Sequence, residues 1–247
     1  MVKLVGILNI TPDSFSDGGL FTNPKQVVKH AKKLFAQGAS LIDIGAESTR
    51  PGATPLSDEE EWERLEPVLK ELLKLYPGRI SLDSYHPENI KKAFKLGPVI
   101  VNDVTGMNNP KMIDAVSKLR PTVIISHLPG DDIQRAHKLT PVKSVEQVRD
   151  DLLSRATLLQ KRGLKKKQII LDPGIGFGKT SEVNSGLLHF AELVPGYLVM
   201  IGYSRKRFLG EKRMEIAPNI KAGRIAIENG AQYLRVHDVL AHKVLVS

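Results

Sequence analysis

The sequence has 247 residues, of which 41% are hydrophobic and 26% are charged, and it contains no cysteine. This length allows one large α/β domain or two small domains with a sizeable core, and the lack of cysteine excludes disulfides and thiolate metal sites. No stretch approaches the roughly 20 apolar residues of a membrane span, and no signal-peptide cleavage site follows Met1. We therefore expect a soluble, cytoplasmic protein that does not bind membranes.

The formal net charge of +9 favours an anionic partner. The basic clusters at 29–33, 161–167 and 204–213 are far apart along the chain, and only 5% of the residues are aromatic. A surface that stacks nucleic-acid bases is therefore improbable. We expect small anionic ligands as partners and no nucleic acid.

Eight short apolar segments recur along the chain, with amphipathic helical patterns between most of them. The clearest helix begins after a capping box formed by Ser57 and Glu60, and another begins at Asn23-Pro24. No linker or repeat divides the chain. This alternation predicts a single (β/α)8 TIM barrel of the α/β class over residues 1–247, with a doubly wound sheet as the alternative. The predicted strands are 4–9, 40–44, 79–82, 99–102, 122–126, 168–171, 197–201 and 233–236.

The segment 172–179 (DPGIGFGK) places a carboxylate and three glycines where the sixth predicted strand ends. Glycines permit positive φ and close backbone approach. The segment is neither a Walker A loop, which would need glycine in place of Pro173, nor a dinucleotide fingerprint, which would need glycine in place of Lys179. In isolation it could be an ordinary glycine-rich turn.

Polar side chains follow every predicted strand, and in a barrel these strand ends meet at one rim, where chemistry occurs. A single residue of this kind is commonly a cap or a turn residue, but eight together indicate a site. Basic side chains on the rim can surround a polyanion, and acceptors suit a flat heterocycle rich in donors. The basic candidates are Arg50, Lys206, Arg235 and His237, and the acceptor candidates are Asp83, Asn102 and Asp172. Asn9 is a plausible ligand for Mg²⁺, which takes its remaining ligands from water and phosphate.

These motifs resemble those of the dihydropteroate synthase family of pterin-binding barrels over nearly the whole chain. The resemblance implies a Mg²⁺-dependent transferase of tetrahydrofolate biosynthesis and a sulfonamide target. The reaction joins 4-aminobenzoate to (7,8-dihydropterin-6-yl)methyl diphosphate by a dissociative displacement that releases pyrophosphate. The segments that carry the resemblance are 9–19, 43–52, 81–84, 102–106, 172–179, 204–206 and 235–238.

The resemblance also implies a role for each matching residue. The pterin would be held by Asp83, Asn102, Asp172 and Lys206, with Mg²⁺ on Asn9. The diphosphate would be bound by Thr49, Arg50, Arg235 and His237. The aminobenzoate site would be shaped by Pro51, Phe177, Ser204 and Lys206, and closed by Phe15 and Asp17. Gly202 and Val236 complete the predicted substrate-binding set, and the predicted catalytic residues are Asp17, Asp83, Asp172 and Lys206.

Two other functions are compatible with part of this pattern. A methyltransferase that uses methyltetrahydrofolate would share the pterin-holding acids but would not need the diphosphate loops. A non-enzymatic module would bind nucleic acid through 205–213, with an affinity that falls steeply with salt. We expect a homodimer, and the short ends of the sequence also fit a synthase domain related to multifunctional folate enzymes.

Overall fold

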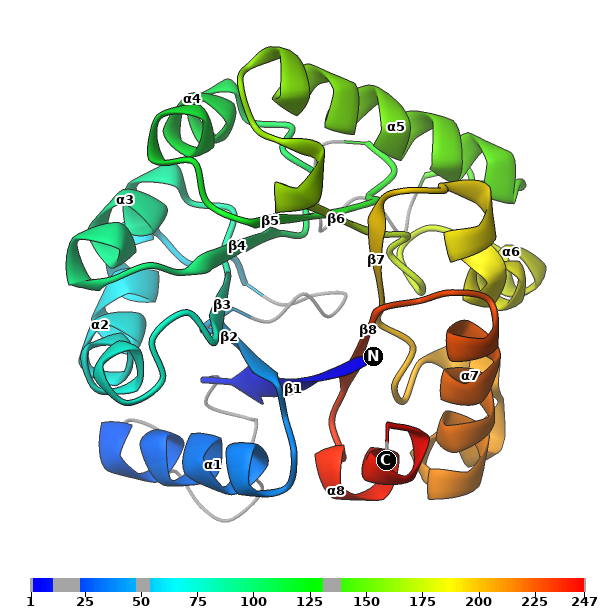
Figure 1. Ribbon diagram of the computed structural model, residues 1–247, viewed down its shortest axis with the longest axis horizontal. Helices are drawn as coiled ribbons and strands as arrows, with labels where there is room; N and C mark the ends of the chain where they lie inside the picture. The colour runs from blue at the N-terminus through cyan, green and yellow to red at the C-terminus, as the bar shows by residue number, and fades with distance from the viewer. Residues whose placement is uncertain (1, 11–22, 48–53, 131–138, 247) are drawn as a thin grey trace.

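The computed structural model describes residues 2–10, 23–47, 54–130 and 139–246. Its eight parallel strands form a closed barrel in sequence order, and β8 pairs with β1. Figure 1 shows the strands at the centre with the helices around them. This architecture confirms the predicted barrel and excludes the doubly wound sheet. The strands are β1 (Lys3–Asn9), β2 (Leu41–Gly45), β3 (Ile80–Asp83), β4 (Ile100–Asp103), β5 (Val123–Ser126), β6 (Ile169–Asp172), β7 (Leu198–Ile201) and β8 (Tyr233–Val236).

Helices cover the outside of the barrel and bury one apolar face each against the strands. The second and fifth helices are the longest, and the eighth is a single turn. The helices are α1 (Pro24–Ala36), α2 (Asp58–Leu75), α3 (Pro87–Leu96), α4 (Pro110–Leu119), α5 (Val145–Lys161), α6 (Ser181–Gly186), α7 (Ile216–Glu228) and α8 (Val239–His242). Within the part of the chain that the structure describes, none of them is long and apolar enough to cross a membrane.

Helix α2 begins with the predicted capping box: Glu60 N donates to Ser57 Oγ at 3.2 Å, and Ser57 N donates to Glu60 Oε2 at 2.9 Å. Its Leu65 is fully buried, whereas Trp62 is only partly covered. The unexpected residue is Glu61, which is 1% exposed. Its carboxylate accepts hydrogen bonds from the Ser84 hydroxyl and the Asn89 amide, so burial raises its pKa without leaving it unpartnered.

The interior of the barrel determines where the site lies. An apolar layer inside the strands contains Leu41, Ile170 and Tyr233. Side chains alternate along a strand, so the residue two positions further on also points inward. Those positions hold Asp43, Asp172 and Arg235. The apolar layer therefore lies below a layer of polar side chains at the C-terminal ends of the strands, which we call the mouth.

Candidate active site

Asp43 is the centre of a hydrogen-bonded cluster in the mouth. Its side chain is 3% exposed and accepts three hydrogen bonds, from Ser81 Oγ at 2.7 Å, Asn102 Nδ2 at 2.9 Å and Arg235 Nη1 at 3.0 Å. These donors come from β3, β4 and β8. The structure thus brings the predicted residues Asn102 and Arg235 together through a carboxylate that was absent from the predicted site.

Arg235 also reaches the second carboxylate of the mouth, with 3.4 Å between its Nη2 and Asp172 Oδ2. Asp172 Oδ1 in turn accepts a hydrogen bond from Gly174 N at 2.8 Å. Burial disfavours the charged guanidinium, but the carboxylates of Asp172 and Asp43 outweigh it and raise the pKa of Arg235. The guanidinium therefore stays charged between the two acids. Gly202 lies against the guanidinium, since a Cβ there would be 3.1 Å from Nη2.

Three buried polar atoms of the mouth accept or donate no hydrogen bond within the described residues: Asn102 Oδ1, Ser126 Oγ and Asp172 Oδ2. Ser126 and Asp172 are partners in the register of β5 and β6. Burial and the Asp43 carboxylate raise the pKa of the adjacent Asp83 well above its usual range. Unsatisfied buried acceptors are rare and commonly mark a binding site. This set fits a flat ring that presents several N–H donors.

An apolar wall adjoins these acceptors. Phe177 packs with Val104 and Leu128, and Tyr85 lies against them. The Lys206 ammonium lies 4.7 Å from the centre of the Phe177 ring, within the range of a cation–π contact. The wall can receive an aromatic ring, and Lys206 can attract its carboxylate. Only Phe177 and Lys206 were predicted, because the other three resemble ordinary core residues in the sequence.

The turns after β7 and β8 meet at Ser204 and His237. The Ser204 hydroxyl lies 3.0 Å from His237 Nδ1 and accepts a hydrogen bond from His237 N at 3.3 Å. Arg205 adopts a positive φ of 61°, and Asn219 of α7 accepts a hydrogen bond from its backbone N–H at 2.9 Å. This conformation leaves Arg205 exposed and holds Lys206 over the mouth. Asn219 is a supporting residue that the sequence did not indicate.

Two predicted residues lie less centrally. Val236 is fully buried among apolar side chains outside the barrel, because it alternates with the inward-pointing Arg235. Its side chain therefore points away from the mouth, and its predicted role in substrate binding, which stays a prediction, would have to come from its backbone. Asn9 ends β1 and is exposed. The remaining predicted residues, Phe15, Asp17, Thr49, Arg50 and Pro51, lie outside the described residues.

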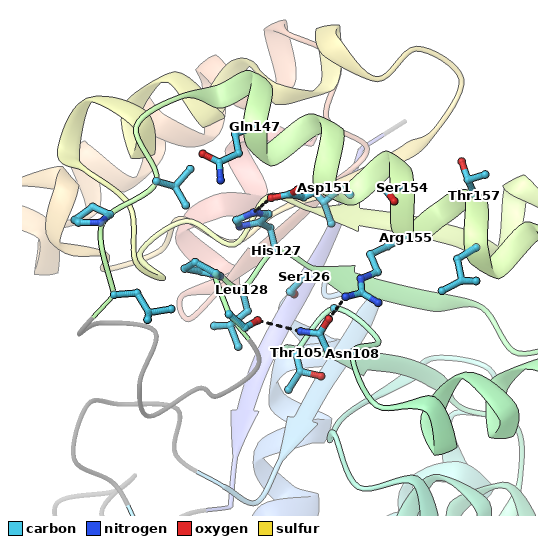
Figure 2. A pocket seen from close by; sticks show the side chains of 18 of the residues that line it. Thr105, Asn108, Ser126, His127, Leu128, Gln147, Asp151, Ser154, Arg155 and Thr157 are labelled. Atoms are coloured by element: carbon cyan, nitrogen blue, oxygen red, sulfur yellow. Dashed lines mark hydrogen bonds and ion pairs between the residues drawn. The ribbon is translucent and has the colours of Figure 1, made fainter.

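A cavity of about 1060 Å³ lies beside the mouth, between α5 and the segments that follow β4 and β5. Figure 2 shows His127 facing Asp151 of α5, and Arg155 of the same helix facing Asn108. His127 Nε2 lies 3.1 Å from Asp151 Oδ2. Burial, helped by the nearby charge of Lys179, lowers the pKa of His127 to about 4. The neutral imidazole therefore anchors the end of β5 to α5 rather than contributing charge to the mouth.

The model of the pterin binding enzymes matches residues 5–237, so the chain belongs to this family of barrel enzymes. The dihydropteroate synthase of Staphylococcus haemolyticus is 40% identical over 96% of this chain and 90% of its own. Among solved structures, the Xanthomonas albilineans dihydropteroate synthase with 4-aminobenzoic acid superposes with a TM-score of 0.89, at 37% identity over 99% of this chain and 90% of the other. The Burkholderia cenocepacia dihydropteroate synthase complexed with 7,8-dihydropteroate gives a TM-score of 0.85, at 34% identity over 99% and 89%.

Proposed function

We propose that the protein joins 4-aminobenzoate to (7,8-dihydropterin-6-yl)methyl diphosphate and releases pyrophosphate, the reaction by which tetrahydrofolate biosynthesis makes 7,8-dihydropteroate. It is a transferase, and its substrates are small molecules. The observation that carries this function is the pairing of unsatisfied acceptors on Asn102 and Asp172 with the guanidinium of Arg235 at one end of a barrel. Relatives that cover nearly the whole chain are dihydropteroate synthases, two of them solved with 4-aminobenzoic acid or 7,8-dihydropteroate.

The geometry supports a separate role for each group of residues. Asp172 and Asn102 accept hydrogen bonds from the donor edge of the pterin, and Asp83 lies beside them. The bond between the methylene carbon and the diphosphate oxygen breaks with its electron pair going to the oxygen, and Arg235 stabilises that charge. The aniline nitrogen then forms the new C–N bond and loses one proton. Phe177 and Lys206 hold the ring and the carboxylate of 4-aminobenzoate.

Magnesium belongs to the proposal as well. No group of three or more His, Asp or Glu residues that could hold a metal occurs within residues 2–10, 23–47, 54–130 and 139–246. The exposed amide of Asn9 at the end of β1 is a single oxygen donor, which fits an ion that takes its other ligands from water and phosphate. When bound, the ion would neutralise charge on the leaving diphosphate. The expected homodimer remains a prediction.

Pyrophosphate release tests the function directly. The protein is incubated with the pterin diphosphate, with or without 4-aminobenzoate, and with magnesium or a chelator. We expect pyrophosphate and 7,8-dihydropteroate in equal amounts only when 4-aminobenzoate and magnesium are both present. A folded protein that forms no dihydropteroate would contradict the proposed function, and equal turnover with the chelator would contradict the magnesium dependence alone.

The rate is also expected to depend on the charge of Lys206. Burial and the neighbouring Arg235 lower its pKa to about 8, so its ammonium is present below that pH and is lost above it. Attraction for the 4-aminobenzoate carboxylate should weaken accordingly, and kcat/KM should fall as the pH rises above about 8. Lys206→Arg keeps its charge over this range and should lack the fall. If kcat/KM of Lys206→Arg fell in the same way above about pH 8, the fall would come from a group other than Lys206.

A further inference from the structure

Lys179 ends the glycine-rich segment and lies beneath the loop that follows β6. Its ammonium donates to three backbone carbonyls: Gly174 O at 2.8 Å, Phe177 O at 3.0 Å and His127 O at 3.2 Å. Within the described residues the Lys179 ammonium forms no ion pair, so backbone carbonyls take the place that a carboxylate commonly has beside a buried lysine. An ammonium group has three donors, and all three are used. Two of them hold the β6 loop, and the third ties that loop to the end of β5.

The loop held in this way forms one side of the apolar wall. Phe177 lies in it, and the Lys206 ammonium rests over the Phe177 ring at 4.7 Å. Lys206 also touches the loop backbone, since a Cβ on Gly176 would be 3.1 Å from its Cδ. A shift of the loop therefore moves the aromatic wall and the cation together. The pterin acceptors lie on β4 and β6 themselves. Asp172 Oδ1 accepts a hydrogen bond from Gly174 N of this loop, but Oδ2, the atom left for the pterin, faces Arg235 of β8.

The backbone of His127, to which Lys179 ties the β6 loop, is itself held in place by three contacts. Its N–H donates to Asp172 O at 2.9 Å, its carbonyl accepts from Lys179, and its ring faces Asp151 of α5 (Figure 2). The carbonyl that Lys179 uses is therefore fixed by two strands and a helix. Burial lowers the pKa of Lys179 to about 7, with the Asp172 carboxylate opposing the shift. A cation in such a place is costly unless hydrogen bonds offset its desolvation, which the three carbonyls do.

We propose that Lys179 is a positioning residue for the second substrate: by clamping the β6 loop to the end of β5, it places Phe177 and Lys206 to receive 4-aminobenzoate, while leaving the pterin acceptors to the barrel. This inference rests on the proposed function and falls with it. The proposal assigns Phe177 and Lys206 to 4-aminobenzoate, and Asn102 and Asp172 to the pterin. Removing the clamp should therefore weaken binding of 4-aminobenzoate and leave binding of the pterin diphosphate unchanged.

The chain contains no cysteine, so a single introduced thiol can be modified selectively. We would prepare Lys179→Cys, with Lys166→Cys as the matched control. Lys166 also donates to a backbone carbonyl, Pro195 O at 3.3 Å, but it precedes β6 and so lies at the opposite end of the barrel from the mouth. Each thiol would then be alkylated with 2-bromoethylamine in urea and the protein refolded, which restores an ammonium group on a side chain of lysine length.

In Lys179→Cys we expect the KM for 4-aminobenzoate to rise about tenfold, as a loop misplacement would cause, with the calorimetric affinity for the pterin diphosphate unchanged. Aminoethylation should restore the KM, and Lys166→Cys should keep it throughout. An unchanged KM, or an equal loss for both substrates whether or not aminoethylation reverses it, would overturn the proposal. Lys179→Met, which keeps most of the length of the side chain without its ammonium group, serves if the cysteine variant does not fold. Failure of the proposed function would instead appear as an unmodified protein without turnover.

Discussion

Asp172→Asn is expected to lower kcat/KM about 10³-fold, close to 4 kcal/mol, the scale for removing one partner of a buried charge pair. The carboxylate is 1% exposed and lies 3.4 Å from Arg235 Nη2. An asparagine of the same size withdraws the charge that faces Arg235 and replaces one acceptor of the pterin site with a donor. Steady-state kinetics and calorimetry with the pterin diphosphate provide the measurement.

Asp238→Asn is the matched control, because Asp238 also lies at the mouth end of the barrel but caps α8 by accepting from Ala241 N at 3.0 Å. Asparagine caps a helix as well as aspartate does, so this variant should keep its activity and its unfolding temperature. If Asp172→Asn retained the affinity for the pterin diphosphate, Asp172 would not be its acceptor.

Gly174→Ala is expected to destabilise the fold by about 4 kcal/mol or more, in the range of the most damaging single substitutions. Gly174 has a φ of +63°, and a Cβ there would lie 2.1 Å from the carbonyl oxygen of His127. Two hydrogen bonds resist a shift of that oxygen, because Lys179 donates to it and the His127 N–H donates to Asp172 O at 2.9 Å. Urea-induced unfolding gives the free energy directly.

Gly78→Ala separates the two causes of this strain. Gly78 has a φ of +72°, but nothing lies within 4 Å of a Cβ built on it. Its replacement should therefore show only the backbone cost of a left-handed residue, about 1–2 kcal/mol. Similar losses in the two variants would mean that the β6 loop moves away from His127 without difficulty, which would also weaken the clamp assigned to Lys179.

The fold could be predicted because the pattern is local. The apolar segments are short and bounded by turn residues, so each predicted strand end agrees with the structure to within one residue. The rim residues followed from the fold, since parallel strands in a barrel deliver their ends to one side. Asn102, Asp172 and Arg235 were found in this way, and the structure brings them together around Asp43.

The contacts between distant segments could not be predicted. Glu61 belongs to a run of acids at the start of α2, which looks like a solvated helix end, yet Ser84 and Asn89 meet it in the core. The pairing of Arg235 with Asp43 and Asp172 depends on strand tilt and stagger, which sequence patterns do not report. Lys179 gave no signal because its partners are backbone atoms, and any residue provides those.

The cluster around Asp43 has a consequence for synthesis of the chain. The Asp43 carboxylate pairs with Arg235, which lies on β8. The barrel closes only when β8 pairs with β1 and β7. A chain emerging from the ribosome therefore holds two inward-facing acids, Asp43 and Asp172, with no guanidinium between them until its final strand is available. The group of two acids and one guanidinium is thus completed only when β8 joins the barrel, and a polypeptide that stops before β8 lacks both the closing strand and the cation that lies between its acids.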